Sequence, residues 1–188
     1  SNSGAAISMD LASNPTISGV TLSGNGVNGV NVDAGTLTGT QVWDDPELVY
    51  RLTGPVTVAA GATLTIGAGQ VVKMYPYYAY GLIINGTLVA DGTDLQPIIF
   101  TSDQDDTAGG DTTSNGATTG SAGQWDGIQF TGTSTGNVLD HVEVRYGGGY
   151  YGAGVRITGS TPTITNSTFQ SNSGAAISMD LASNPTIS

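Results

Sequence analysis

The sequence predicts an all-β protein, a parallel β-helix (solenoid) with about six coils per 170-residue repeat. The chain of 188 residues contains 29 Gly and only four Lys and Arg, a composition that disfavours long surface helices. The eighteen residues SNSGAAISMDLASNPTIS occur twice, at 1–18 and 171–188. A shorter and degenerate period lies inside this long one, and such periods are typical of solenoids.

The shorter period is visible where "PTITNSTFQSNSGAAISMD" (162–180) aligns without gaps on "PTISGVTLSGNGVNGVNVD" (15–33). Each unit holds a short apolar–polar–apolar strand, which points alternate side chains inward. The strands recur every 22–27 residues except for one step of 46, so we expect them to stack as parallel rungs with Gly, Asn, Ser and Pro at the corners. The six predicted rungs are 30–32, 56–58, 82–84, 128–130, 155–157 and 177–179.

The long period predicts a single β-helix segment over 1–188, one 170-residue period plus an overlap of 18 residues. The one long step contains an insertion at 101–124. Because the chain starts in mid-pattern without an initiator Met, we expect it to be part of a longer protein. An antiparallel sandwich is the alternative fold, but it does not explain the internal alignment.

The charge balance narrows the range of partners. Fifteen Asp and Glu against four Lys and Arg give a net charge of −11, which disfavours nucleic acid and anionic membranes. No run of about 18 apolar residues is present, so we expect no membrane insertion. The absence of Cys excludes disulfides and thiolate chemistry.

Several segments resemble the right-handed parallel β-helix repeats of secreted and cell-surface tandem-repeat proteins of bacteria. These segments are "GPVTVAAGATLTIGAGQVVKM" (54–74), "GLIINGTLVADGTDLQPIIFTS" (81–102), "QWDGIQF" (124–130) and "VLDHVEVRYGG" (138–148). The resemblance implies an extracellular or cell-surface location and an adhesin-like role. A fold shared with pectin-cleaving enzymes does not by itself imply catalysis.

The sequence predicts no catalytic residues. The resemblance implies that an active relative would carry an Arg or Lys beside Asp-bound calcium, or clustered Asp with His and an Arg-x-Lys element, and the segment "VRIT" (155–158) lacks that Lys. The single His141 corresponds to Asn166 of the next coil, a corner position. The pairs Asp44-Asp45 and Asp105-Asp106 remain an alternative, because paired carboxylates can act as acid and base.

The insertion contains the strongest local signal for a ligand. The segment "DQDDTAGGDTTSNG" (103–116) gathers carboxylates and free carbonyls, the hard oxygen ligands that calcium prefers. The candidate calcium ligands are Asp103, Asp105, Asp106 and Asp111. A solvated acidic loop without metal is the alternative interpretation.

Two tyrosine clusters, "YPYYAY" (75–80) and "YGGGYYG" (146–152), hold seven of the eight Tyr. Exposed Tyr rings could contact sugar rings or a neighbouring filament. The candidate contact residues are Tyr77, Tyr78, Tyr150 and Tyr151. Mutual stacking over a corner of the coil is the alternative.

Together these features predict a structural repeat unit of an extracellular filament, stalk or adhesin shaft, not an enzyme. A strand edge without a cap can pair with a further coil, so the expected partner is a second copy or repeat, joined head to tail. A polysaccharide-binding surface module is the alternative, and a polysaccharide lyase or hydrolase is the least favoured function.

Overall fold

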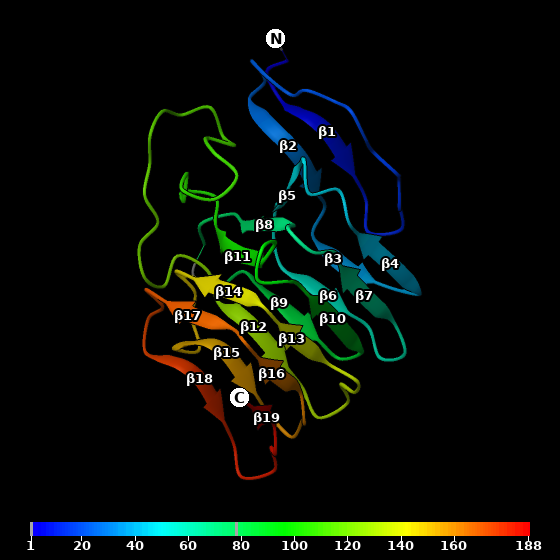
Figure 1. Cartoon of the computed structure of the whole chain (residues 1–188), viewed down its shortest axis with the longest axis vertical. Helices are drawn as coiled ribbons and strands as arrows, with labels where there is room; N and C mark the ends of the chain where they lie inside the picture. The colour runs from blue at the N-terminus through cyan, green and yellow to red at the C-terminus, as the bar shows by residue number, and fades with distance from the viewer. Residues whose placement is uncertain (1, 78) are drawn as a thin grey trace.

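The computed structural model describes residues 2–77 and 79–188, and it confirms the predicted all-β parallel β-helix (Figure 1). The described residues form nineteen strands and no helix, so no helix among them could cross a membrane. All the strand ladders are parallel, and each inner coil pairs with the coils before and after it.

The strands assemble into three sheets that run along the solenoid. Sheet A contains β1 (Ala5–Met9), β2 (Val27–Val32), β5 (Val49–Leu52), β8 (Val71–Met74), β11 (Ile98–Ser102), β14 (Val142–Arg145) and β17 (Thr168–Gln170). Sheet B contains β3 (Gly35–Leu37), β6 (Val56–Val58), β9 (Gly81–Ile84), β12 (Gly127–Phe130), β15 (Ala153–Ile157) and β18 (Ala175–Met179). Sheet C contains β4 (Thr40–Trp43), β7 (Thr63–Ile66), β10 (Thr87–Asp91), β13 (Val138–Asp140), β16 (Thr163–Thr165) and β19 (Thr186–Ile187).

The core lies between the three sheets and consists of stacked apolar side chains. In sheet B the strand register places Ile84 opposite Val58 and Phe130, and Phe130 opposite Ile157. Each of these four side chains is almost completely buried. Alternation in the strands therefore produces continuous inward rows, as the apolar–polar–apolar pattern predicts.

The corners between the sheets differ in length. From sheet C to sheet A the chain turns within one or two residues in two coils, and His141 and Asn166 there both have φ of 48°. This confirms the predicted equivalence of His141 and Asn166. Three of the connections from sheet A to sheet B are 75–80, 103–126 and 146–152, and 103–126 is the longest connection between strands in the described part of the chain. The Tyr clusters and the acidic insertion therefore share one edge of the solenoid.

One predicted rung lies in a different sheet. Five of the six rungs stack in sheet B, but residues 30–32 belong to β2 of sheet A, and β3 supplies the strand that pairs with β6. Val30, Val32 and Leu37 are all fully buried. Both segments thus satisfy the apolar pattern, which shows which side chains point inward but not which sheet they join.

The two copies of the eighteen-residue repeat also lie in different sheets. Residues 5–9 form β1 of sheet A, whereas the identical residues 175–179 form β18 of sheet B. They lie at opposite ends of the solenoid (Figure 1). The sequence therefore fixes the strand conformation of this segment, while the neighbouring coil decides its sheet.

Truncating an inward side chain should destabilise the solenoid much more than truncating its outward neighbour. We expect Ile84→Ala to lower the free energy of unfolding by about 2–5 kcal/mol, because it leaves a cavity in a buried row. Ile83→Ala, on the opposite face of β9, is the matched control and should cost about 1 kcal/mol or less. Urea unfolding measures both, and equal losses would contradict this assignment of faces.

Candidate functional site: a braced polar row and a tyrosine surface

The outer face of sheet A carries a row of polar side chains. Strand register places Arg51 beside Lys73 and Lys73 beside Thr101, and Arg145 follows one residue after the Phe100–Val144 pair. Three of the four basic residues of the chain lie in this row. From the N-terminal end, the row consists of Ser8, Asn31, Arg51, Lys73, Thr101, Arg145 and Gln170.

The insertion covers the middle of this row and supplies its counter-charges. Asp103 accepts hydrogen bonds from Arg51 Nε at 2.9 Å and forms an ion pair with Arg51 Nη2 at 2.8 Å. Lys73 is completely buried, and its Nζ donates to the carbonyl oxygen of Gly110 at 2.7 Å. The connection 103–126 is slightly offset from the predicted insertion, because Thr101 and Ser102 complete β11.

Burial lowers the pKa of Lys73, and the nearby carboxylates of Asp106, Asp105, Asp103 and Asp111 act in the opposite direction. An ammonium group removed from water needs compensating charge close by. The acidic residues of the insertion provide it. The insertion is therefore an electrostatic cover for the basic row as well as an acidic surface.

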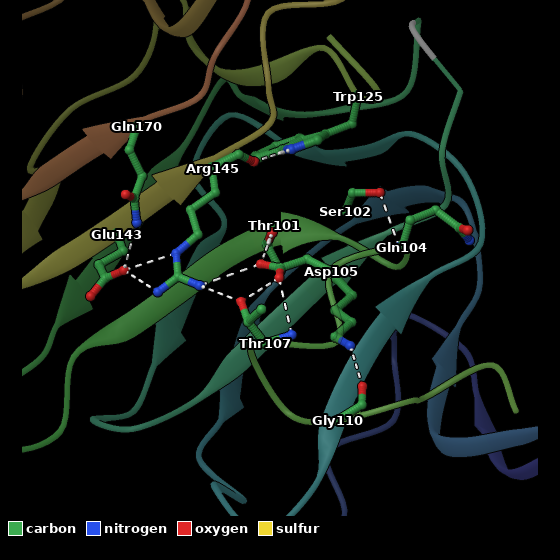
Figure 2. Close-up of polar contacts among 11 residues, drawn as sticks. Thr101, Ser102, Gln104, Asp105, Thr107, Gly110, Trp125, Glu143, Arg145 and Gln170 are labelled. Carbon is green, nitrogen blue, oxygen red and sulfur yellow. Dashed lines mark hydrogen bonds and ion pairs between the residues drawn. The ribbon is translucent and has the colours of Figure 1, made fainter. Parts of the chain in front are cut away.

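Asp105 is the central group of this cover (Figure 2). Its carboxylate accepts hydrogen bonds from Thr101 Oγ1 at 2.8 Å and from the backbone N–H of Thr107 at 3.1 Å. Arg145 Nη1 lies 3.4 Å from Asp105 Oδ2, and Arg145 Nε donates to Glu143 at 2.9 Å. Arg145 therefore connects Glu143 of its own strand with Asp105 of the insertion.

Opposing effects act on the pKa of Asp105. Burial raises it, but the hydrogen bonds from Thr107 and Thr101 and the charge of Arg145 together lower it below its usual value. The ionised carboxylate is therefore the form that suits the folded state.

The insertion also contacts coils on both sides of its own. Toward the N-terminal end, the backbone N–H of Asn28 donates to the carbonyl oxygen of Thr112 at 2.7 Å. Toward the C-terminal end, the backbone N–H of Gly123 donates to the carbonyl oxygen of Gly147 at 3.2 Å. These contacts span the solenoid from β2 to the connection after β14, so the insertion is a lateral brace across several coils.

The remaining two candidate calcium ligands already have other partners. Asp106 Oδ2 accepts hydrogen bonds from the backbone N–H of Thr118 at 2.6 Å and from its Oγ1 at 3.0 Å. Asp111 accepts from the backbone N–H groups of Asn115 at 3.2 Å and Gly116 at 3.0 Å. In the described part of the chain, no three His, Cys, Asp or Glu side chains are placed to hold a metal ion together. Calcium binding stays a prediction, and it would require several of these carboxylates to exchange partners.

The predicted Tyr residues lie along the corner between sheets A and B, except that Tyr78 is outside the described residues. The rings of Tyr77 and Tyr80 are 4.6 Å apart, and Tyr150 contacts Tyr151 edge to face at 4.8 Å. The guanidinium of Arg156 lies 4.2 Å from the centre of the Tyr151 ring. Mutual ring contacts therefore occur, yet 43% of Tyr77 and 62% of Tyr150 remain exposed.

Asp126 joins the two Tyr clusters, which the sequence did not reveal. Its backbone N–H donates to the carbonyl oxygen of Tyr80 at 2.7 Å. Its Oδ1 accepts from the backbone N–H groups of Tyr150 at 3.0 Å and Tyr151 at 2.9 Å, and Oδ2 accepts from Gln129 at 2.7 Å. This buried carboxylate thereby fixes the backbone beneath an exposed aromatic surface.

The other candidate acid and base groups have structural contacts. His141 Nε2 lies 2.9 Å from Asp94 at the corner between sheets C and A, and Nδ1 lies 3.1 Å from Asp140. Asp45 accepts a hydrogen bond from the hydroxyl of Tyr50 at 2.7 Å, and burial together with that bond raises the pKa of Tyr50. These contacts connect neighbouring segments of the coil.

Neutralising Asp105 should loosen the brace in a pH-dependent manner. We expect Asp105→Asn to lower the free energy of unfolding by about 2 kcal/mol at pH 7, because the charge-assisted bonds are lost. The pKa of Asp105 is lowered in the folded state, so its stabilisation is present above the unfolded pKa of about 4. It is lost as the pH falls through the folded pKa, and the difference between variant and parent should shrink there.

Asp33→Asn is the matched control for this measurement, because the Asp33 side chain is exposed and lies outside the brace. Urea unfolding between pH 3 and pH 7 measures the free energy, and amide hydrogen exchange across 103–126 reports on the brace. A constant difference between Asp105→Asn and the parent at every pH would contradict the electrostatic account.

Comparison with known proteins places this architecture in a family. The family model described as a pectate-lyase like beta helix domain matches residues 35–160, which run from β3 to the corner after β15. A search of curated proteins and a search of solved structures found no match. Because the matched region covers more than half of the chain and the structure has the stacked parallel coils of that description, the chain belongs to the pectate-lyase-like β-helix domain family.

Proposed function

We propose that this chain is a structural repeat unit of an extracellular filament, stalk or adhesin shaft, which grows end to end by continuing the β-helix. The observation that carries the proposal is the continuous parallel stacking of coils in three sheets, together with an eighteen-residue segment that recurs after 170 residues. The last strands of the three sheets, β17, β18 and β19, each pair with a strand on one side only. Met179 and Ile187 are each 50% exposed in these last strands. In the preceding coil, the side chains of the same inward rows are buried.

Such an end is a template for another coil. Unpaired strand edges and exposed apolar side chains favour addition of a strand, and soluble solenoids usually cover them with a cap. The 170-residue repeat supplies a suitable next coil, because the residues that follow 1–18 in this chain would also follow 171–188 in a further repeat. The contact between repeats would join unlike ends, which generates filaments.

The polar row supports a structural role in a second way. Arg51, Lys73 and Arg145 are engaged by the acidic residues and carbonyl groups of the brace and by Glu143. Their contacts hold coils together across the outer face of sheet A. Catalytic turnover is the less favoured function, and cleavage of an acidic polysaccharide by the purified chain would argue for it.

A chain of several 170-residue units should form one continuous rod. Six coils at the parallel strand spacing add about 29 Å per unit, so two and three units should differ in length by that amount. Small-angle scattering and electron microscopy measure the length. Ser178→Pro at the joint removes a ladder hydrogen bond and should introduce a break. Compact particles whose maximum dimension does not grow with the number of units would contradict the proposal.

A polysaccharide-binding surface is the second candidate, favoured by the arrangement of Tyr150, Tyr151 and Arg156. The exposed rings stand on a backbone that Asp126 holds in place, so they are ordered before any ligand arrives. Aromatic side chains ordered in this way can stack on sugar rings with little loss of conformational entropy. The binding candidates remain Tyr77, Tyr78, Tyr150 and Tyr151.

Removing these rings should weaken binding if the surface recognises polysaccharide. We expect Tyr150→Ala combined with Tyr151→Ala to reduce affinity by about tenfold, because two ring contacts are lost. The double variant Tyr77→Ala with Tyr78→Ala tests the other cluster. Leu95→Ala is the control, since Leu95 is 94% exposed on another corner. Glycan arrays followed by titration calorimetry measure binding, and unchanged affinity in both double variants would contradict this function.

A further inference from the structure

We propose that a cavity between the insertion and the loop 10–26 binds a primary ammonium group carried on an aliphatic chain, the group that a lysine side chain and a polyamine share. The cavity has a volume of about 350 Å³, which lies within the range of ligand sites. None of the residues that line it belongs to either copy of the eighteen-residue segment. The site is independent of the proposed end-to-end growth of the solenoid.

Three segments of the chain enclose the cavity. The loop between β1 and β2 contributes Val20 and Leu22, and the insertion contributes Asp111. The connection from β4 to β5 contributes Glu47, and β5 itself contributes Val49 on the outer face of sheet A. These segments are far apart in the sequence, so the site exists only because the insertion folds back over sheet A.

Hydrogen bonds fix the three segments relative to one another. The backbone N–H of Asn28 donates to the carbonyl oxygen of Thr112 at 2.7 Å, and Asn28 Nδ2 donates to Ser114 Oγ at 2.9 Å. The backbone N–H of Gly19 donates to Glu47 Oε2 at 3.1 Å. The cavity is therefore formed before a ligand arrives, which reduces the entropy lost on binding.

The charge of the cavity is negative. Among the described residues that line it, Glu47 and Asp111 are the acidic ones, and none is Lys, Arg or His. Glu47 accepts one hydrogen bond and Asp111 accepts two within the described chain, so both carboxylates can accept more. Of the four carboxylates that act on buried Lys73, Asp111 has the smallest effect, so Lys73 neutralises it least. An ammonium group supplies the complementary charge and three N–H donors.

The apolar side of the cavity fits an aliphatic chain. Val20 is 40% exposed, Leu22 is half-buried and Val49 is buried under the insertion. Methylene groups packed against these side chains would leave water, which favours binding. An inorganic cation would satisfy the carboxylates but would leave the apolar side in contact with water.

The ligand comes from a molecule other than a second copy of this chain. Lys73 is the only Lys in the sequence, and it is completely buried. Two sources of the group remain, a lysine side chain of a partner protein and a free polyamine. They differ in whether a peptide backbone accompanies the ammonium group, so a pair of probes can distinguish them.

A nuclear magnetic resonance titration of the isotope-labelled chain measures binding and also locates it. We expect cadaverine and Nα-acetyl-lysine methylamide to shift the backbone amides of Gly19, Asn28 and Gly109, which lie in or beside the cavity. Pentanol lacks the charge and ammonium chloride lacks the aliphatic chain, so neither should produce this pattern at the same concentration. Tighter binding of the lysine derivative would assign the site to a partner protein, and tighter binding of cadaverine would assign it to a polyamine.

Substitutions in the cavity separate specific binding from attraction to an acidic protein. Glu47→Gln and Asp111→Asn should each weaken binding by about tenfold, because each removes a charge while its amide oxygen can still accept the bonds that hold the loops. Val20→Ser should weaken binding of cadaverine by a few fold, because it removes part of the apolar side. Asp33→Asn is the matched control, since Asp33 is exposed and lies outside the cavity.

Three results would overturn the proposal. They are the absence of shifts at the cavity with either amine, equal shifts with ammonium chloride and cadaverine, and equal weakening by Asp33→Asn and the two cavity variants. None of them bears on the length of a chain of several repeats, so failure of this site and failure of end-to-end growth are distinguishable.

Discussion

The parallel, in-register stacking of coils is the constraint on which the rest of this structure depends. Each strand must present its apolar side chains inward at the same height as the strands before and after it, as Val58, Ile84, Phe130 and Ile157 do in sheet B. Extra residues cannot enter a strand without moving its alternate side chains to the other face. Insertions are therefore confined to corners, and the longest, 103–126, lies at the corner between sheets A and B.

This confinement explains why the chemically distinctive residues gather on one edge. The Tyr clusters and the acidic insertion are far apart in sequence, but they leave the solenoid at the same corner of successive coils. Asp126 connects the two Tyr clusters, while the insertion folds back over the row that contains Arg51, Lys73 and Arg145. An edge built in this way combines a lateral brace with an exposed aromatic surface. A structural unit and a polysaccharide-binding unit could thus share one architecture.

The ends of the solenoid follow from the same constraint. Every coil needs a neighbour on each side to satisfy its backbone and bury its inward row, and a terminal coil has only one. The eighteen-residue segment illustrates the consequence, because Leu11 is buried under the β2 coil while the identical Leu181 is exposed. Growth by further repeats is one way to supply the missing neighbour.

The sequence alone determined the repeating coil, the inward residues of each strand and the corner role of His141, because these depend on local alternation and on the period. It did not place residues 30–32 in sheet A, since Val30, Val32 and Leu37 fit the same alternating pattern. It also did not predict what Lys73 and Asp126 contact. Their roles depend on which residues of distant coils stack beside them, such as Gly110 and Tyr150. Only the tertiary structure decided the sheet of residues 30–32 and the partners of Lys73 and Asp126. The alternation of apolar and polar residues along the sequence determines whether a side chain points inward or outward. The register between coils determines which side chains lie beside it.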